Sequence, residues 1–366
     1  MKPLLQISNL SITFRVRKTE FEAVKNLNLS IEENQVAGLV GESGSGKSVT
    51  AMSIMRLLPE PKAQFSPESS IMFNGEDVLQ ASTKKLRELR GNEIAMIFQE
   101  PMTSLNPYHR VGDQIIESIQ LHKAQPKSEA ILEAKNLMSL VEIAEVDRRF
   151  SAYPHELSGG QRQRIMIAMA LANKPKLLIA DEPTTALDVT IQAQILDLMT
   201  KLKDEIGMSV LFITHDLGLI ERFSDTITVM QEGEVVEQGP TKEVFANPQH
   251  KYTQKLINAE PSAKKEMSTP ESPIISVKDL NVFYPLPKTK LFKKEFFHAV
   301  KDVNFSIPQN STIGLVGESG SGKSTLGKAL AGLIKYEGSV EYQGNDIGAL
   351  NPKKSKLLKK DIQIIF

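Results

Sequence analysis

The chain of 366 residues contains no cysteine. It can therefore form no disulfide bond, no thiolate zinc site and no cysteine-bound iron–sulfur cluster, which suits a reducing compartment. Long apolar runs are lacking as well, because no stretch approaches the ~18 residues that a membrane-spanning helix needs. We therefore expect a cytoplasmic protein whose role at a membrane, if it has one, is peripheral.

An excess of charge of one sign is also lacking. Lys and Arg together number 44, as do Asp and Glu, so the formal net charge is zero. Proteins that bind nucleic acid usually carry a clear excess of positive charge, so we expect no nucleic-acid partner. The lysine-rich stretch Lys353–Lys360 is interpreted as a solvated helix face. The amino end alternates apolar with polar residues after a single lysine, which is typical of a strand and not of a secretion signal.

The sequence repeats itself. AVKNLNLSI at 23–31 returns as AVKDVNFSI at 299–307, and GLVGESGSGKS at 38–48 returns letter for letter at 314–324. A repeat of this length indicates two copies of one domain in a single chain.

The segment between the two copies has the composition of a linker. PSAKKEMSTPESP is rich in Pro, Ser, Lys and Glu and has almost nothing to bury. We therefore expect a first domain at 1–260, a linker at 261–273 and the N-terminal part of a second domain at 274–366.

Short apolar runs separated by helical patterns predict the fold class. QVAGLV, LLIA and VLFIT are bounded by Gly, Asp or Pro, as are buried strands of a parallel sheet. Strands that alternate with helices favour an α/β fold with a largely parallel sheet covered on its faces. The amphipathic stretch Ser128–Val146 is predicted to be helical and to separate the two halves of the first copy.

A phosphate-binding loop is predicted between a strand at Val36–Val40 and a helical pattern at Val49–Leu58. Its glycines let successive N–H groups face phosphates at the positive end of the helix. Lys47 would reach the outer phosphates and the Ser48 hydroxyl would hold Mg²⁺. The alternative is a Gly/Ser turn that only caps a helix. The candidate nucleotide-binding residues are Gly41, Ser43, Gly44, Ser45, Gly46, Lys47, Ser48 and Val49, and in the second copy Gly317, Ser319, Gly320, Ser321, Gly322, Lys323, Ser324 and Thr325, with Ser324 as its metal ligand.

Two acids follow the apolar strand LLIA. The carboxyl end of a parallel strand is where such folds place their ligand chemistry. Asp181 is a candidate Mg²⁺ ligand, and Glu182 is a candidate base that orients and deprotonates the attacking water. Acids that merely favour a helix N-terminus are the alternative.

A second anion site is predicted at LSGGQ. Ser158 precedes a helical pattern as an N-cap would, and Gly159 and Gly160 leave the first N–H groups uncovered, with Gln161 next. Taken alone, an SGG segment usually forms only a cap or turn.

The order and spacing of these motifs resemble the nucleotide-binding domain of ABC ATPases. The resemblance implies that Gln99 contacts Mg²⁺ and the water, that Asp188 belongs to the D-loop of the ALD motif at 186–188, and that His215 is the switch histidine near the γ-phosphate. It also implies that Phe14 and Tyr284 stack on adenine. Without the resemblance, an aromatic such as Phe14 is more often a core residue and a histidine such as His215 more often a helix cap.

The same resemblance implies a P-loop NTPase fold. It consists of a RecA-like core, an antiparallel β subdomain and a helical subdomain at about 100–172. Two such domains form a head-to-tail sandwich in ABC proteins, with each ATP between the P-loop of one and the LSGGQ of the other. Catalysis by Glu182, His215 and Gln99 would therefore need a second domain in trans or a further part of the chain.

Narrower features resemble the ATPases of oligopeptide and dipeptide importers. They are FQEPMTSLNP at 98–107, the approach to LSGGQ at 152–160, and a tail at about 233–260 that contains FANPQHKYTQKLI. Lys251 departs from the family, whose tail usually has proline there. The tandem arrangement resembles the fused ATPase subunit of microcin C/peptide importers of Gram-negative bacteria.

This narrower resemblance implies ATP and Mg²⁺ as cofactors, two membrane permease subunits and a periplasmic substrate-binding protein as partners, and a peripheral position on the cytoplasmic face of the inner membrane. Permease contact is expected around Gln99–Pro107, which Pro101, Asn106 and Pro107 make a loop.

The second copy ends at Phe366, the counterpart of Phe98, one residue before its Q-loop glutamine. We expect a truncated second domain that keeps its P-loop strand and lacks a second LSGGQ. A soluble tandem ABC protein acting on ribosomes or DNA, an export ATPase, and a regulatory module without turnover remain as alternatives.

Overall fold

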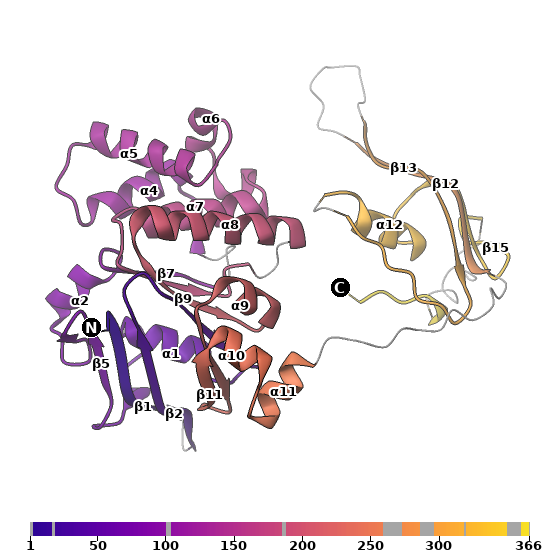
Figure 1. The fold of residues 1–366 in the computed structure, drawn as a ribbon. Coiled ribbons are helices and arrows are strands. Elements are labelled where there is room, and N and C mark those ends of the chain that lie inside the picture. The colour runs from indigo at the N-terminus through magenta and orange to yellow at the C-terminus, as the bar shows by residue number, and fades with distance from the viewer. Residues whose placement is uncertain are drawn as a thin grey trace. The chain divides into compact units, whose positions relative to one another are not determined.

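The computed structural model describes residues 3–16, 19–99, 104–184, 188–258, 273–285, 296–317, 320–349 and 360–365. Pro101, Ala186, Ser319, the stretch 353–359 and most of the expected linker lie outside these ranges. The chain divides into two compact units, 1–261 and 262–366, each with its own core. Figure 1 gives their elements.

A parallel sheet forms the centre of the first unit. Its strand order is β11-β10-β3-β9-β8-β7, in which β11 alone runs antiparallel to its neighbour. All residues of β3, β8 and β9 are buried, as the three apolar runs of the sequence predict. The strands are β3 (Val36–Val40), β7 (Ile94–Ile97), β8 (Leu177–Asp181), β9 (Ser209–Thr214), β10 (Thr226–Gln231) and β11 (Glu234–Pro240).

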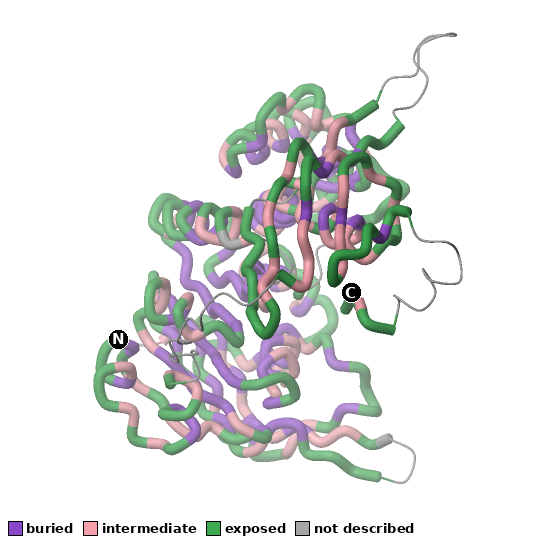
Figure 2. The backbone as a smooth tube through the Cα atoms, turned by 90° about the vertical axis from the view of Figure 1, so that its right-hand side faces the viewer, coloured by how far each residue is buried: buried purple, intermediate pink, exposed green. Residues whose placement is uncertain are grey.

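Both faces of this sheet are covered, because successive side chains of a strand point to opposite faces. Val40 and Ala180 belong to a core shared with the helices, whereas Leu39 and Ile179 belong to a second core on the other face. Figure 2 shows the buried backbone of this unit gathered in the sheets and the adjoining helices. The chain therefore needs nearly continuous apolar runs in these strands.

An antiparallel sheet covers the face of the parallel sheet that carries Leu39 and Ile179. Its order is β2-β1-β5-β6, with β4 also paired to β1. Helix α1 (Lys47–Ile54) contributes Ala51 and Ile54 to the same core as this sheet, so the helix that follows the predicted P-loop is held by both sheets. The strands are β1 (Leu5–Val16), β2 (Thr19–Ile31), β4 (Ala63–Phe65), β5 (Ser70–Phe73) and β6 (Glu76–Asp77).

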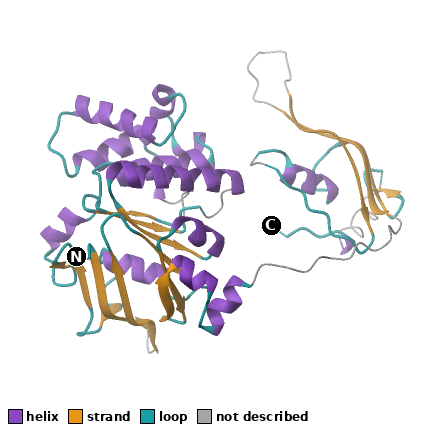
Figure 3. Ribbon diagram, viewed as in Figure 1, coloured by secondary structure: helices purple, strands orange, loops and turns teal. Residues whose placement is uncertain are grey.

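Helices pack on the opposite face, which carries Val40 and Ala180, and form a lobe of their own (Figure 3). The prediction of continuous helix over 128–146 is wrong in its second part. Helix α5 ends at Leu140, and Glu142 and Glu145 have φ angles of 59° and 53°, which no α-helix accommodates. The lobe contains α4 (Val111–Gln120), α5 (Lys127–Leu140), α6 (Val146–Phe150), a 3₁₀ helix (Pro154–Glu156) and α7 (Gly159–Leu171).

The other helices in the described residues of the first unit are α2 (Thr83–Leu89), α8 (Val189–Ile206), α9 (Leu217–Phe223), α10 (Thr241–Ala246) and α11 (Lys251–Ile257). Among the helices that the structure describes, none is both long and apolar enough to cross a membrane.

The second unit has an antiparallel sheet of order β13-β12-β14-β15, and helix α12 packs against it. The strand expected before its P-loop does not form. Ile313, Leu315 and Val316 are 46%, 53% and 91% exposed, and their backbone is not in a sheet. In the first unit β3 is held between β9 and β10, and the described residues of the second unit include no parallel neighbour of this kind. The elements are β12 (Pro273–Pro285), β13 (Phe296–Pro308), α12 (Lys323–Leu330), β14 (Glu337–Tyr342) and β15 (Asn345–Asp346).

Candidate functional site

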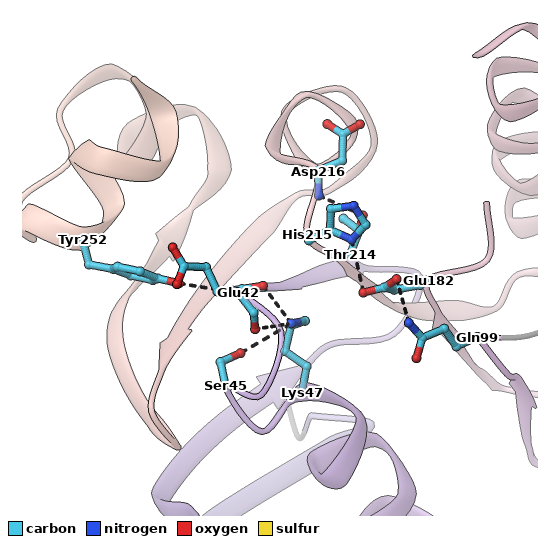
Figure 4. A network of polar contacts seen from close by, with 10 residues as sticks. Glu42, Ser45, Lys47, Gln99, Glu182, Thr214, His215, Asp216 and Tyr252 are labelled. Atoms are coloured by element: carbon cyan, nitrogen blue, oxygen red, sulfur yellow. Dashed lines mark hydrogen bonds and ion pairs between the residues drawn. The ribbon is translucent and has the colours of Figure 1, made fainter. Parts of the chain in front are cut away.

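The predicted P-loop runs from the end of β3 into the N-terminus of α1. Its turn depends on Gly46, which has a φ of 101° and whose Cβ, if present, would lie 2.6 Å from the Ala23 carbonyl oxygen. The Lys47 ammonium donates to the carbonyl oxygens of Gly41 at 2.7 Å and Glu42 at 2.9 Å (Figure 4). The lysine thus lies folded over its own loop, with the free N–H groups of a helix N-terminus beside it.

Lys47 sits among opposite charges in a buried position, with only 6% of its surface exposed. Burial lowers the pKa of its ammonium, while Glu182 and Asp181 act in the opposite direction. A cation held between two acids and a helix N-terminus is suited to polyphosphate binding, because the phosphates would be attracted by both the cation and the helix.

The end of β8 offers an oxygen ligand beside the P-loop. Asp181 is 3% exposed, and burial raises the pKa of its carboxyl, partly opposed by a hydrogen bond to Ser48. Among the described residues, its Oδ1 atom finds no hydrogen-bond partner. A buried carboxylate oxygen without a donor, next to a serine hydroxyl, has the chemistry of a hard-cation ligand. The residues present therefore fit a magnesium ion.

Glu182 is the meeting point of three elements. Its Oε2 accepts from Gln99 Nε2 at 3.0 Å, and its Oε1 lies 3.2 Å from His215 Nδ1. Its own backbone is left-handed, with a φ of 46°, and its N–H donates to the Ile213 carbonyl at 2.9 Å. The residues after β7, β8 and β9 therefore converge, because parallel neighbours end at one edge of the sheet. All three catalytic candidates of the sequence lie together (Figure 4).

His215 does not cap a helix. The N-cap of α9 is Asp216, whose carboxylate accepts from the Leu219 N–H at 3.3 Å. His215 is left with its side chain 64% exposed and directed to Glu182. The alternative interpretation of His215 as a helix cap therefore does not apply.

The LSGGQ segment forms the expected N-terminus of α7. The Ser158 hydroxyl accepts from the Gln161 N–H at 3.3 Å, and the Gln161 side chain accepts from the Ser158 N–H at 3.1 Å. Gly159 and Gly160 occupy the first turn, and a Cβ on Gly160 would lie 2.9 Å from Ile191. Within the described residues, no polar contact joins this segment to the P-loop of the same unit.

Asp188, expected in the D-loop, is the N-cap of α8 and accepts from the Ile191 N–H at 3.0 Å. Phe14 lies in β1, half-buried against the core between the sheets, and Tyr284 lies in β12 with 39% of its surface exposed. Nothing in the geometry singles out either aromatic as an adenine contact, so these assignments remain predictions.

The second P-loop repeats the turn of the first. Lys323 donates to the Gly317 carbonyl oxygen at 2.6 Å, as Lys47 does to Gly41. Gly320 and Gly322 have φ angles of 82° and 95°. Ser324 and Thr325 lie in the first turn of α12, as Ser48 and Val49 lie in that of α1, and Ser321 lies in the loop before it. The described residues of the second loop therefore have the local geometry of their counterparts in the first.

One contact of the P-loop was not predicted from the sequence. The hydroxyl oxygen of Tyr252 in α11 accepts from the Glu42 N–H at 2.9 Å. The tail was expected only as a family feature. The sequence carried no signal for this contact, because the 7% exposure of the tyrosine, whose buried hydroxyl needs a partner, is a property of the folded chain.

A phosphate-binding loop between a parallel strand and a helix, with an acid-ended strand two places along the sheet, defines a P-loop nucleoside triphosphatase. A family model described as "ABC transporter" matches residues 24–185 and 300–366, and one described as "Oligopeptide/dipeptide transporter, C-terminal region" matches 236–281. The chain belongs to the ABC transporter family.

Similar proteins of known name agree with this assignment. A peptidoglycan transport ATP-binding protein of Agrobacterium fabrum is 48% identical over the whole chain, which spans 67% of that protein. An uncharacterized ABC transporter ATP-binding protein of Escherichia coli K12 is 47% identical over 99% of the chain and 69% of its own length. A glutathione import ATP-binding protein of Escherichia coli O157:H7 is 43% identical over 99% of the chain and 64% of its own length.

Solved structures show the same fold. A dimeric ATP-binding cassette in a post-hydrolysis state with ADP and phosphate is 29% identical, with a TM-score of 0.58 over 65% of this chain and 98% of that one. A cassette of the cbiONQ transporter complex from Clostridium perfringens is 28% identical, with a TM-score of 0.57 over 71% of this chain and 96% of that one.

These findings confirm the α/β P-loop fold and an ATP-binding subunit with ATPase activity in an ABC transporter. They also confirm the tail region as one found in oligopeptide and dipeptide transporters.

Proposed function

We propose that the chain is the ATP-hydrolysing subunit of an ABC importer for peptides or peptide-like compounds. The observation that carries the proposal is the convergence of Gln99 and His215 on Glu182, 3.0 and 3.2 Å away, beside a P-loop lysine. The peptide cargo rests on the tail at 236–281 and on relatives named for peptidoglycan transport and glutathione import.

ATP binding is assigned to the P-loop. The N–H groups of Ser43 to Val49 would surround the β- and γ-phosphates, and the Lys47 ammonium would exchange its two carbonyl partners for phosphate oxygens. This exchange is favourable because charged acceptors bind an ammonium more strongly than neutral carbonyls do. Phe14 is proposed to stack on the adenine ring. The second P-loop would bind a nucleotide in the same way through Lys323, with Tyr284 as its aromatic.

Ser48, Asp181 and Gln99 are the proposed ligands of Mg²⁺, with Ser324 as the counterpart of Ser48 in the second unit. The ion would neutralise charge on the β- and γ-phosphates. The unpartnered Asp181 Oδ1 beside the serine hydroxyl supports this assignment.

Glu182 is proposed to orient the attacking water and to accept its proton. Two neighbours fix its carboxylate, so it needs little reorganisation when a water arrives. Gln99 holds one oxygen, and His215 holds the other and would turn toward the γ-phosphate when it is bound. The side chain of Glu182 is 12% exposed, so a water can reach its carboxylate from solvent.

A second cassette is proposed to complete the site. The N-terminus of α7 offers Ser158 and two glycine N–H groups to an anion, yet makes no described contact with its own P-loop. The γ-phosphate of an ATP held by one cassette would therefore meet the LSGGQ of another, with Asp188 near the junction. The dimeric cassette bound to ADP and phosphate supports this arrangement.

The two units are proposed to be tandem copies of one cassette, as the repeat at 38–48 and 314–324 and the double family match support. Their boundaries are proposed at 1–260 and 274–366.

Two permease subunits and a periplasmic binding protein are the proposed partners, at the cytoplasmic face of the inner membrane. A pocket of about 270 Å³ lies beside the Q-loop, and apolar side chains of β7 and α7 line it together with Phe98 and Leu121, which follow β7 and α4. Phe98 and Leu121 in its lining are 45% and 72% exposed. An apolar hollow of this kind suits a partner helix, and its position next to Gln99 would link permease movement to the γ-phosphate.

Copurification from membranes solubilised in mild detergent tests this function. We expect the intact chain to retain two integral membrane proteins, and the Phe98→Asp variant to retain fewer of them while still binding ATP. Retention of ribosomes, or an ATP-binding chain that retains no membrane protein, would contradict the importer assignment.

A further inference from the structure

We propose that Tyr252 is a positioning residue for the nucleotide site, through which the C-terminal tail holds the start of the P-loop. The inference rests on the proposed function, because it concerns the loop assigned to ATP. The inference gives the tail a second role, in which it stabilises the ATPase site of its own unit.

The contact is direct and partly buried. The Tyr252 hydroxyl oxygen accepts the Glu42 N–H at 2.9 Å, and the tyrosine is 7% exposed (Figure 4). The residues are 210 positions apart in the chain, so the bond ties its tail to its first phosphate-binding element. The Glu42 N–H is only partly buried, but loss of its acceptor would still leave it incompletely hydrogen-bonded, so the bond restrains the loop.

The tail that contains α11 is itself held in place, so it can restrain the P-loop. The Glu237 carboxylate in β11 accepts the N–H groups of Gln249 at 2.7 Å and His250 at 3.0 Å, just before α11 begins. The Thr253 hydroxyl and these two N–H groups together hold the pKa of the Glu237 carboxyl below its usual range, against the opposing effect of burial. β11 is the edge strand of the parallel sheet. A continuous path therefore runs from the sheet edge through α11 to Glu42.

The position of the restraint decides what it can affect. Glu42 follows Gly41, whose carbonyl oxygen, like that of Glu42 itself, accepts a hydrogen bond from Lys47. A shift of Glu42 would move both carbonyls that position the lysine. Loss of the tyrosine hydroxyl should therefore weaken nucleotide binding and leave the carboxylate of Glu182 where it is.

The charged contact between the same elements contributes less. Lys255 Nζ lies 3.5 Å from Glu42 Oε1, and their side chains are 73% and 60% exposed. Exposed pairs of this kind contribute little to stability. The restraint is therefore assigned to the tyrosine hydroxyl and not to the ion pair.

The experiment compares the full chain with Tyr252→Phe, which removes one oxygen and keeps the packed ring. Thr253→Val is the matched control, since it removes a hydroxyl that is 0% exposed in the same helix and faces Glu237 instead of the P-loop, and it leaves both backbone bonds to Glu237 in place. Dissociation constants for MgATP are measured by calorimetry at 4 °C on Glu182→Gln backgrounds, together with thermal unfolding of each nucleotide-free protein.

We expect Tyr252→Phe to weaken MgATP binding by about two- to ten-fold, the value of one hydrogen bond, and Thr253→Val to leave the affinity unchanged. Equal affinity of Tyr252→Phe and its parent would overturn the inference. So would an equal loss in both variants, which would mean that the tail acts only through its general stability. If the parent itself bound no MgATP, the proposed function would fail instead, so the two failures are distinct.

Discussion

Glu182 Oε1 lies 3.2 Å from His215 Nδ1, although the two residues follow different strands of the parallel sheet. β8 and β9 are direct neighbours, so residues just beyond their carboxyl ends meet. Gln99 completes the group from the end of β7, on the other side of β8. The chemistry of the site thus follows from the order of three strands.

Replacing Glu182 with Gln should separate binding from turnover. The amide keeps the shape of the side chain but cannot accept the proton of the attacking water, so turnover should fall by about 10²-fold or more with MgATP affinity retained. Phosphate release and calorimetry measure the two quantities. Glu234→Gln, in an exposed pair with Lys25, is the control and should behave as the parent. Full turnover in Glu182→Gln would remove this residue from the role of base.

Replacing Asp181 with Asn should stabilise the nucleotide-free protein while weakening its response to Mg²⁺. The pKa of Asp181 is raised by burial, so the folded state holds a proton more readily than the unfolded state. The ionised carboxyl therefore reduces stability above its folded pKa, and this cost disappears as the pH falls through that pKa.

Thermal unfolding from acid to neutral pH tests this sign. The melting temperature of Asp181→Asn should exceed that of the parent at neutral pH, and the difference should shrink on acidification. A variant less stable than the parent at neutral pH would show that ionisation of Asp181 does not reduce the stability of the folded chain.

The glycines of the P-loop should differ in their tolerance of a methyl group. Gly46→Ala and Gly44→Ala both place alanine at positive φ, which costs about 1–3 kcal/mol. Only at Gly46 does the new carbon also meet backbone, 2.6 Å from the Ala23 oxygen, whereas the space beside Gly44 is open. Chemical denaturation should therefore show a larger loss of stability for Gly46→Ala, and equal losses would contradict the described turn.

Two inactive chains should restore each other if LSGGQ acts across a dimer. Lys47→Ala removes the P-loop cation, and Gly160→Asp puts a negative side chain at the start of α7, where a Cβ already meets Ile191 at 2.9 Å. Each variant alone should hydrolyse ATP poorly, whereas their mixture should recover part of the parental rate. A mixture no more active than its components would rule out completion of this site in trans.

The sequence was informative wherever local chemistry decides the structure. β3, β8 and β9 are buried on both faces, and their apolar runs predicted them. The P-loop turn and the Ser158 N-cap could also be predicted, because glycine at positive φ and serine at an N-cap act through their nearest neighbours.

Long-range effects escaped prediction. The strand expected before the second P-loop depends on partners that the described second unit does not provide, although the residues GLV at the end of β3 recur there. The break between α5 and α6 depends on left-handed backbone at Glu142 and Glu145. Neither residue is a glycine, so the sequence did not indicate this conformation. The contact of Tyr252 with Glu42 spans 210 residues, and no local pattern could reveal it.

Nucleotide binding by Lys47→Ala tests the central claim most directly. Loss of the charge-assisted contacts to phosphate should weaken MgATP binding about ten-fold or more, with no loss of folded structure by circular dichroism. An affinity equal to that of the parent chain would show that this loop does not hold the nucleotide.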